Sequence, residues 1–156
     1  MINYENVKAM WLSQFDMWSI YCKDGQQRPK EEFIPLVETV FDKLVDTGIN
    51  TAIIQTRPNA DSMYPSKYYT MSKYVVGAYG REANYDPLRI VIDEAHKRNI
   101  SIHAWINPLR CMTEEEIKSV SEDLAIGKGY NDKDINGKMI GQVGRNFSLD
   151  PAYEEV

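Results

Sequence analysis

The sequence predicts an α/β protein, namely the N-terminal part, about three β/α units, of a TIM-type (β/α)8 barrel. Two observations predict this fold class. Three short apolar segments end in polar or charged side chains, and amphipathic helical patterns separate the segments along the chain. Strands that alternate with helices in this way are typical of a parallel sheet. Polar residues at the carboxyl ends of such strands are where α/β enzymes place their ligand contacts.

The first unit is expected to comprise a strand at residues 10–13, a long loop over residues 14–30 and a helix over residues 31–47. The helix is predicted because its apolar residues recur on one face at the helical period, and Gly48 suits a left-handed stop. Pro35 is tolerated only in a first turn, which keeps the predicted helix start near residue 31. The apolar face holds Phe33, Leu36, Val37, Val40, Phe41, Leu44 and Val45.

The second unit opens with a β-branched, apolar strand at residues 50–56, as expected of a parallel strand that helices cover. The loop that follows, residues 57–85, is too long for a simple connection. Loops of this length are usually functional or disordered, and the aromatic content argues against disorder. We expect it to wall a ligand groove or to pack on itself over the end of the barrel. Its tyrosines are Tyr64, Tyr68, Tyr69, Tyr74, Tyr79 and Tyr85.

A second helix is expected to begin at Asp86 and Pro87, an N-cap followed by proline at the first helical position, and to close at Asn99. A third apolar strand follows at residues 100–106. The buried stripe of the helix is expected to hold Leu88, Val91, Ile92 and Ala95.

Three further signals follow the third strand. Thr113 and Glu116 form a predicted capping box for a short helix. The Asn-Gly pair at residues 136–137 predicts a small hairpin, and the Asp-Pro pair at residues 150–151 predicts the start of another helix. The short helix is expected to hold Ile117, Val120 and Leu124.

Three strands with helices around them leave both edges of the sheet open. This fits either a complete small parallel sheet or the first part of an eight-unit barrel, which typically needs about 250 residues. We favour the barrel. Residues 1–156 are therefore expected to be a single partial domain, truncated at its C-terminal end, that self-associates through its open edges and interior.

The composition is that of an ordinary globular protein, with 43% hydrophobic and 26% charged residues. A formal net charge of -5 argues against nucleic acid or an anionic membrane surface as the main partner. No segment has the length of a membrane span, and the N-terminus lacks the apolar core of a signal peptide. Cys22 and Cys111 have no metal-like spacing, and we expect two reduced thiols rather than a disulfide.

No phosphate-binding loop, zinc ligand set, nucleophile elbow or dinucleotide fingerprint occurs in the sequence. Neither a cofactor nor a metal is therefore expected. No lysine lies at a predicted strand end, which argues against Schiff-base chemistry.

Several short motifs occur along the chain in a familiar combination. They are Trp-Leu at residues 11–12, Phe-Asp at 15–16, Gln-Thr-Arg-Pro at 55–58 with Asp61, Tyr-Pro-Ser at 64–66, Gly-Arg at 80–81, Tyr-Asp-Pro-Leu at 85–88, Glu-Ala-His at 94–96, His-Ala-Trp-Ile-Asn-Pro at 103–108 and Leu-Asp-Pro at 149–151. Together these motifs resemble the N-terminal part of the glycosyl-hydrolase-like (β/α)8-barrel family of bacterial envelope proteins, formerly labelled a domain of unknown function. The resemblance covers essentially the whole chain.

The resemblance implies a barrel that hydrolyses a glycosidic bond in bacterial cell-wall or related polysaccharide, because some members act on the glycan strands of peptidoglycan. It also implies an envelope or secreted location. Glycosidases generally need two placed carboxyl groups. The family's acids are expected at later strand ends, beyond Val156, so the chain alone is expected to be inactive. The alternatives are a non-catalytic carbohydrate-binding or scaffold module, and an isomerase or aldolase on a similar barrel.

Gln55 and Arg57 share a face with Ile53 at the end of the second strand, so both are expected to point into the barrel mouth. A guanidinium there either binds hydroxyl or carboxylate groups of a substrate or forms a buried ion pair that holds the strand ends together. Asp16 and Asp61, the acids that follow a strand end closely, are the candidate partners of that ion pair.

His103, Trp105 and Asn107 share parity on the third strand, and we place them in the barrel interior. Asn107 is expected to bind a sugar hydroxyl or to cap the turn at Pro108. Trp105 is expected to stack on a pyranose ring or to fill the core. His103, which lies deeper, is more often an interior histidine than a catalytic one. The candidate substrate-binding residues, expected to converge at the C-terminal strand ends, are Asp16, Gln55, Arg57, Asp61, Tyr64, His103, Trp105 and Asn107.

Overall fold

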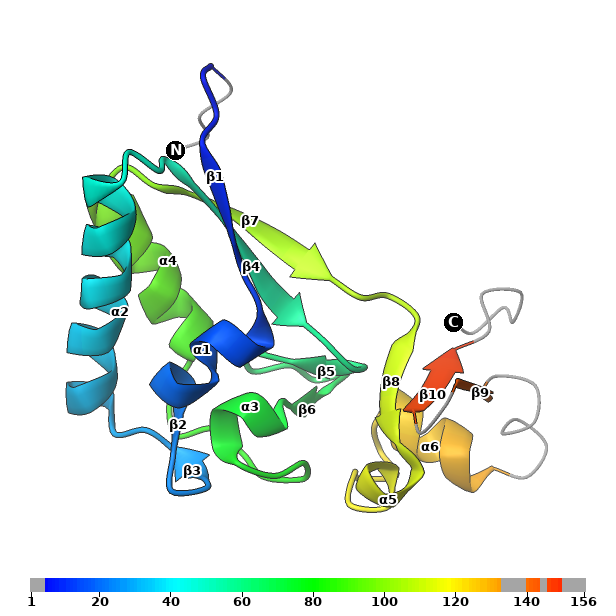
Figure 1. The fold of residues 1–156 in the computed structure, drawn as a ribbon. Helices are drawn as coiled ribbons and strands as arrows, with labels where there is room; N and C mark the ends of the chain where they lie inside the picture. Colours follow the sequence, from blue (N-terminus) through cyan, green and yellow to red (C-terminus); the bar gives the residue numbers. More distant parts are fainter. Residues whose placement is uncertain (1–4, 133–139, 144–145, 150–156) are drawn as a thin grey trace.

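The computed structural model describes residues 5–132, 140–143 and 146–149 and has a mixed α/β fold (Figure 1). Its central feature is a parallel sheet of β1 (Ala9–Leu12), β4 (Thr51–Arg57) and β7 (Ser101–Ile106), in the order β1-β4-β7. The register sets β1 and β7 on either side of β4 over most of its length. The predicted α/β class with a parallel sheet is confirmed, and each strand lies within one residue of its expected position.

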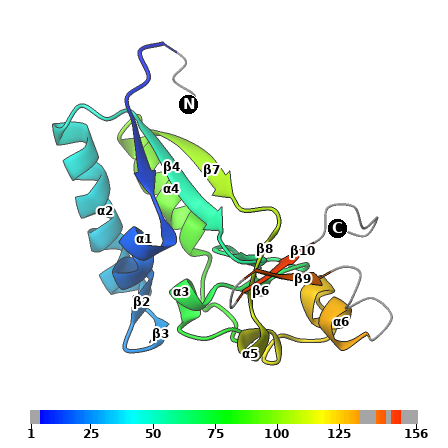
Figure 2. The same ribbon diagram turned by 45° about the vertical axis from the view of Figure 1, so that its right-hand side comes forward.

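Two helices, α2 (Lys30–Asp46) and α4 (Pro87–Lys97), cover one face of this sheet (Figures 1 and 2). Both were predicted from their apolar stripes. The side chain of Asp86 caps α4 by accepting a hydrogen bond from the backbone N–H of Arg89 (3.1 Å). One detail was wrong: α2 begins at Lys30, so Pro35 lies inside the helix and not in its first turn. The core between helices and sheet includes Phe33, Val37, Phe41, Leu44, Ala52, Ile54, Val91, Ala95 and Ile100.

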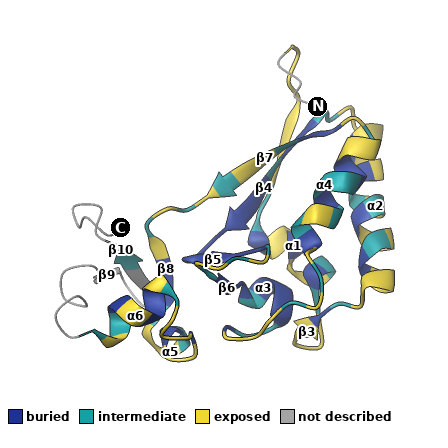
Figure 3. Ribbon diagram, turned by 180° about the vertical axis from the view of Figure 1, so that it is seen from behind, coloured by how far each residue is buried: buried dark blue, intermediate teal, exposed yellow. Residues whose placement is uncertain are grey.

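In the described part of the chain, no layer of helices covers the opposite face of the sheet. In Figure 3 the edge strands β1 and β7 are largely exposed, whereas β4 between them is buried. Trp11, which is 58% exposed, lies opposite Ile53 in the register, and Ile53 lies opposite His103. The Trp11 and Trp105 rings meet edge to face at 5.1 Å. Aromatic side chains therefore line a sheet face that the described residues leave bare.

Residues 14–30 were expected to form a loop, and that expectation was wrong. They form α1 (Gln14–Tyr21) and a hairpin of β2 (Cys22–Lys23) and β3 (Gln26–Gln27). The helix begins there because Ser13 and Asp16 make a capping box, with each side chain bound to the other's backbone N–H. The hairpin turns at residues 24–25, both with positive φ (52° and 71°), a conformation that Asp and Gly tolerate.

The tyrosine-rich segment after β4 is folded, as its aromatic content predicted. It contains β5 (Asp61–Ser62), which pairs with β6 (Thr70–Met71), and the short helix α3 (Lys73–Val76). Tyr74 and Tyr79 are buried within it.

A second, smaller unit follows β7. It comprises β8 (Arg110–Thr113), α5 (Glu114–Ile117), α6 (Ala125–Asn131), β9 (Ile140–Val143) and β10 (Asn146–Leu149), with an antiparallel sheet in the order β8-β10-β9.

The capping box predicted after the third strand is confirmed, but its helix ends at Ile117, so both Val120 and Leu124 lie outside it, and Leu124 precedes α6. A small core forms here around Cys111, Met112, Ile117, Val120 and Ile126. The turn predicted at residues 136–137 and the helix start at residues 150–151 lie outside the described residues.

Among the described residues no helix is long and apolar enough to span a membrane. No disulfide joins Cys22 and Cys111 in the structure, and the Cys111 Sγ contacts the carbonyl oxygen of Leu109 (3.6 Å).

Candidate functional site

The carboxyl ends of β4 and β7 are joined by Arg57. Its Nη1 donates to the carbonyl oxygens of Asn107 (3.1 Å) and Pro108 (2.9 Å), and its own carbonyl accepts from the backbone N–H of Asn107 (2.9 Å). The two residues expected to meet at the strand ends are therefore in direct contact. In the described part of the chain the guanidinium binds carbonyl oxygens, so the ion pair with Asp16 or Asp61, one of the two alternatives for Arg57, is not formed.

Arg57 is only 8% exposed, and its guanidinium carbon lies 4.4 Å from the centroid of the Tyr69 ring. Carbonyl oxygens and an aromatic face compensate the charge in place of a carboxylate. Its Nε is buried and has no hydrogen-bond partner among the described residues. A ligand would reach this donor only if the surrounding side chains moved.

Asn107 and Gln55 use their amides to hold the strand ends. Asn107 Oδ1 accepts from the indole Nε1–H of Trp105 (3.0 Å), and its Nδ2 donates to the carbonyl of Pro58 (3.1 Å). Gln55 Oε1 accepts from the backbone N–H of Gln14 (3.1 Å), which ties the start of α1 to β4. These bonds fix the positions of all three strand ends relative to one another.

Asp61 has no exposure to solvent. Its carboxylate accepts hydrogen bonds from the backbone N–H of Asn59 (2.7 Å) and from the Tyr79 hydroxyl (3.2 Å). Burial raises the pKa of Asp61, and hydrogen bonds from Ser72, Asn59 and Tyr79 oppose that rise without cancelling it. Asp61 lies inside the segment after β4, out of reach of a ligand on the surface.

Asp16 is exposed but is held by the start of α1. Its Oδ2 accepts from the hydroxyl (2.7 Å) and the backbone N–H (2.8 Å) of Ser13, and these bonds hold the pKa of Asp16 below its usual value. Its carboxylate therefore stabilises a helix end and stays ionised, which disfavours a role as proton donor.

Five of the eight predicted site residues keep side-chain surface, and in two of them, Asp16 and Asn107, the polar groups already hold the hydrogen bonds described above. Trp105 is half-buried and His103 is exposed on the bare face of the sheet. Tyr64 is half-buried, and its carbonyl accepts a hydrogen bond from the Ser62 hydroxyl (2.7 Å). Whether any of the eight predicted residues binds substrate remains a prediction.

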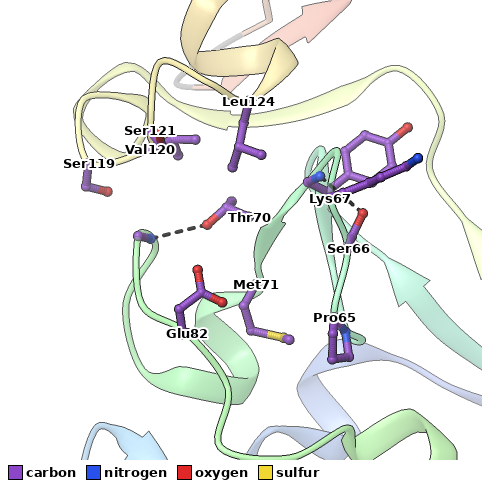
Figure 4. Close-up of a pocket in the computed structure, with 12 residues that line it drawn as sticks. Pro65, Ser66, Lys67, Thr70, Met71, Glu82, Ser119, Val120, Ser121 and Leu124 are labelled. Carbon is purple, nitrogen blue, oxygen red and sulfur yellow. Dashed lines mark hydrogen bonds between the residues drawn. The ribbon is translucent and has the colours of Figure 1, made fainter.

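A cavity of about 580 Å³ lies between the loop after β4 and the segment after β7 (Figure 4). Figure 4 shows the side chains of Thr70 and Met71 on one side and those of Ser119, Val120, Ser121 and Leu124 on the other, with the Glu82 carboxylate beside Met71. Tyr69, whose ring lies on Arg57, also lines the cavity. The cavity therefore adjoins the strand-end contacts, and its size is in the range of small-molecule sites.

The tyrosine-rich loop was expected to wall a ligand groove or to pack on itself, but its pairing with residues 119–124 was not predicted, because contacts between two separate loops leave no local pattern in a sequence. Phe15 and Trp18, two exposed aromatic residues of α1, were not predicted to lie on a helix, because residues 14–30 were expected to form a loop. The capping box of Ser13 and Asp16 was the signal that could have placed both on a helix.

Within residues 5–132, 140–143 and 146–149, no group of three or more His, Cys, Asp or Glu side chains is placed to hold a metal ion.

The sequence matches a known family and several curated proteins. The family described as Glycosyl hydrolase-like 10 matches residues 6–156. Glycosyl hydrolase YngK of Bacillus subtilis (strain 168) is 42% identical over 120 residues, which cover 75% of this chain and 23% of that protein. Glycosyl hydrolase DigH of Escherichia coli (strain K12) is 35% identical over 122 residues, which cover 74% of this chain and 27% of that protein. The matched part thus spans about a quarter of each relative.

Proposed function

The chain belongs to the glycosyl hydrolase-like 10 family, and we propose that it is the N-terminal part of a (β/α)8-barrel glycoside hydrolase domain. The proposed substrate is the glycan of a bacterial cell wall or a related polysaccharide. In this proposal the single domain continues through further β/α units, whose strands complete the sheet.

One observation carries the proposal: a parallel sheet with helices on one face and bare aromatic side chains on the other. All-parallel sheets occur almost only in proteins that cover both of their faces. Trp11, Ile53, His103 and Trp105 lie on the bare face. Further strands that close a barrel would cover this face and would leave the C-terminal strand ends open as a ligand site.

In this proposal the catalytic acids and the side chains that contact the sugar come from different parts of the barrel. Glycoside hydrolysis generally needs a proton donor and a second carboxylate on opposite sides of the scissile bond. Of the two acids close to strand ends, Asp61 is enclosed and Asp16 caps a helix. The catalytic acids are therefore assigned to the further units, while Trp105, His103 and Tyr64 would contact the sugar on a frame fixed by Arg57 and its partners.

A non-catalytic carbohydrate-binding module is the second candidate function. This function is favoured because Asp61 is enclosed and Asp16 caps a helix. A binding module needs side chains that contact the sugar, but it needs no catalytic acids. Both candidates share a glycan ligand, and they differ in whether the full-length protein would cleave it, since this chain alone is expected to be inactive in both.

The test is to incubate the purified chain with wall glycan freed of stem peptides and to measure both binding and new reducing ends, with a muramidase as positive control. We expect binding without turnover. Robust turnover that is lost in Asp16→Asn or Asp61→Asn would overturn the assignment of the catalytic acids to the further units. Absence of glycan binding would overturn the proposed function.

A further inference from the structure

Two aromatic rings of α1 are exposed side by side and backed by a third. Phe15 is 62% exposed and Trp18 is 49% exposed, although both belong to a folded helix. Each meets the buried ring of Tyr74 edge to face, with centroids 5.6 Å and 5.5 Å away. We call Phe15 and Trp18 the aromatic platform. Tyr74 restricts how far either ring can turn, so the platform is held in place without a ligand.

A cavity of about 370 Å³ lies beside the aromatic platform, and its other walls are the β2–β3 turn and the end of α3. The turn packs so closely that a Cβ at Gly77 would overlap the carbonyl of Gly25. Arg81 donates to that same carbonyl (2.7 Å) and to the carbonyl of Val76 (3.3 Å). The fold thus holds a hairpin turn against α3, and the aromatic platform borders the resulting hollow.

The aromatic platform adjoins the strand-end site. Helix α1 begins directly after β1, and its first residue, Gln14, is bonded to Gln55 at the end of β4. A chain-like ligand that occupies the strand ends would extend across neighbouring surfaces of this end of the sheet. None of the contacts that hold the strand ends needs Phe15 or Trp18 to be exposed.

Polar groups lie beside the two rings. Ser19 and the carboxylate-bearing Asp24 line the same cavity. An apolar ring face beside hydroxyl and carboxylate groups suits a pyranose, which has an apolar C–H face and a polar hydroxyl rim. A protein partner suits it less. Two aromatic side chains bury about 150–250 Å² each, well short of the roughly 800 Å² per partner of a stable interface.

We propose that the aromatic platform is a further glycan subsite, where Phe15 and Trp18 stack on one pyranose ring and Asp24 and Ser19 hydrogen-bond its hydroxyl groups. The inference rests on the proposed glycan-binding function and extends it to a surface of α1. It assigns the hairpin turn a purpose, which is to present Asp24 at the rim of the subsite.

The experiment follows the three indole N–H signals of Trp11, Trp18 and Trp105 by heteronuclear NMR during titration of the chain with a peptide-free wall-glycan octasaccharide. We expect the Trp18 signal to shift together with that of Trp105. If Trp105 shifts and Trp18 does not, the subsite is wrong while the proposed function stands. If no signal shifts and calorimetry detects no binding, both are wrong.

Variants of Phe15 and Trp18 distinguish a loss of stacking on the sugar from a loss of the fold. Trp18→Ala and Phe15→Ala are each expected to weaken octasaccharide binding about tenfold. Trp18→Leu keeps an apolar contact with Tyr74 but has no flat ring, so it should fold normally and bind as weakly as Trp18→Ala. The matched control is Val45→Ala, a comparably exposed apolar residue (46%) on the outer helix α2. Unchanged affinity in Trp18→Leu, with an intact circular dichroism spectrum, would overturn the proposal.

Discussion

Asp61 has the raised pKa that often marks a catalytic acid, yet its surroundings give it a structural role. The carboxylate is enclosed, and it joins Asn59 to Tyr79 across the segment after β4. Burial and the nearby carboxylates of Asp61 and Glu116 also raise the pKa of Tyr79, so its hydroxyl remains a donor. A catalytic acid must reach its substrate, and Asp61 reaches only its own loop.

Asp61 should make the stability of the chain depend on pH. Its pKa in the folded protein lies above the ordinary value of 3.8, so folding favours the protonated carboxyl. The stability gained from that proton is complete below the ordinary pKa and is lost as pH rises through the raised one. We expect the unfolding free energy of the wild type, measured in urea and compared with Asp61→Asn, to fall as pH rises through this window. If the difference in unfolding free energy between the wild type and Asp61→Asn stays constant with pH, the raised pKa of Asp61 is refuted.

Arg57 shows what a sequence can and cannot predict about a site. Their positions just after two parallel strands predicted that Arg57 and Asn107 meet, because the carboxyl ends of parallel strands lie at one edge of a sheet. The register shift between Gln55 and Arg57, which sets Arg57 opposite Ile106, was not predictable from the alternation of side chains. The partners of their polar groups were not predictable. They are the carbonyls of Asn107, Pro108 and Pro58 and the indole of Trp105, and each depends on how two loops turn after their strands.

Removal of the Arg57 side chain should loosen the contact between β4 and β7. Arg57→Ala deletes two hydrogen bonds to carbonyl oxygens and the contact with the Tyr69 ring, at an expected cost of about 2–3 kcal/mol in unfolding free energy. The comparison is Arg89→Ala, which removes an exposed arginine of α4 and should cost less than about 0.5 kcal/mol. Equal effects of the two substitutions, measured by urea denaturation, would contradict the role given to Arg57.

At the scale of elements, helices with one apolar stripe were predictable and α1 was not. In α2 the buried residues Phe33, Val37, Phe41 and Leu44 recur at helical spacing. In α1, large apolar side chains point both into the core and out to solvent, so no single stripe appears. The local signal for α1 is its capping box, since a cap depends only on residues three positions apart.

The capping box should account for a measurable part of the stability of α1. Ser13→Ala removes the hydroxyl that accepts from the backbone N–H of Asp16, and the expected loss is about 1 kcal/mol. It also removes the hydroxyl that donates to the Asp16 carboxylate, so the pKa of Asp16 should rise toward its usual value, as followed by carboxyl NMR titration. Thr39→Ala, which deletes a hydroxyl within α2, is the control and should leave the pKa of Asp16 unchanged.

At the scale of the whole molecule, the central sheet has a covered face and a bare one. Within the described residues β1 and β7 each pair only with β4, so each also has an edge without a strand partner. Unpaired strand edges and exposed apolar faces promote association between chains. In a closed barrel the same surfaces would be internal, which explains why aromatic residues occupy them.

The isolated chain is therefore expected to self-associate through the bare face. Trp11→Lys places a charge at the centre of that face and should shift the sedimentation profile toward monomer. Val45→Lys introduces the same charge on the outer helix and should leave the profile as in the wild type. A wild-type chain that sediments as a stable monomer at high concentration would contradict the partial-barrel account.

We propose that the C-terminal ends of β1, β4 and β7 form a glycan-binding surface. A crystal structure of the chain with a bound peptide-free wall-glycan oligosaccharide tests it most directly. We predict sugar density at that end of the sheet, within hydrogen-bonding or stacking distance of Trp105, His103 or Tyr64. Density confined to the N-terminal strand ends or to the outer faces of α2 and α4 would contradict the claim.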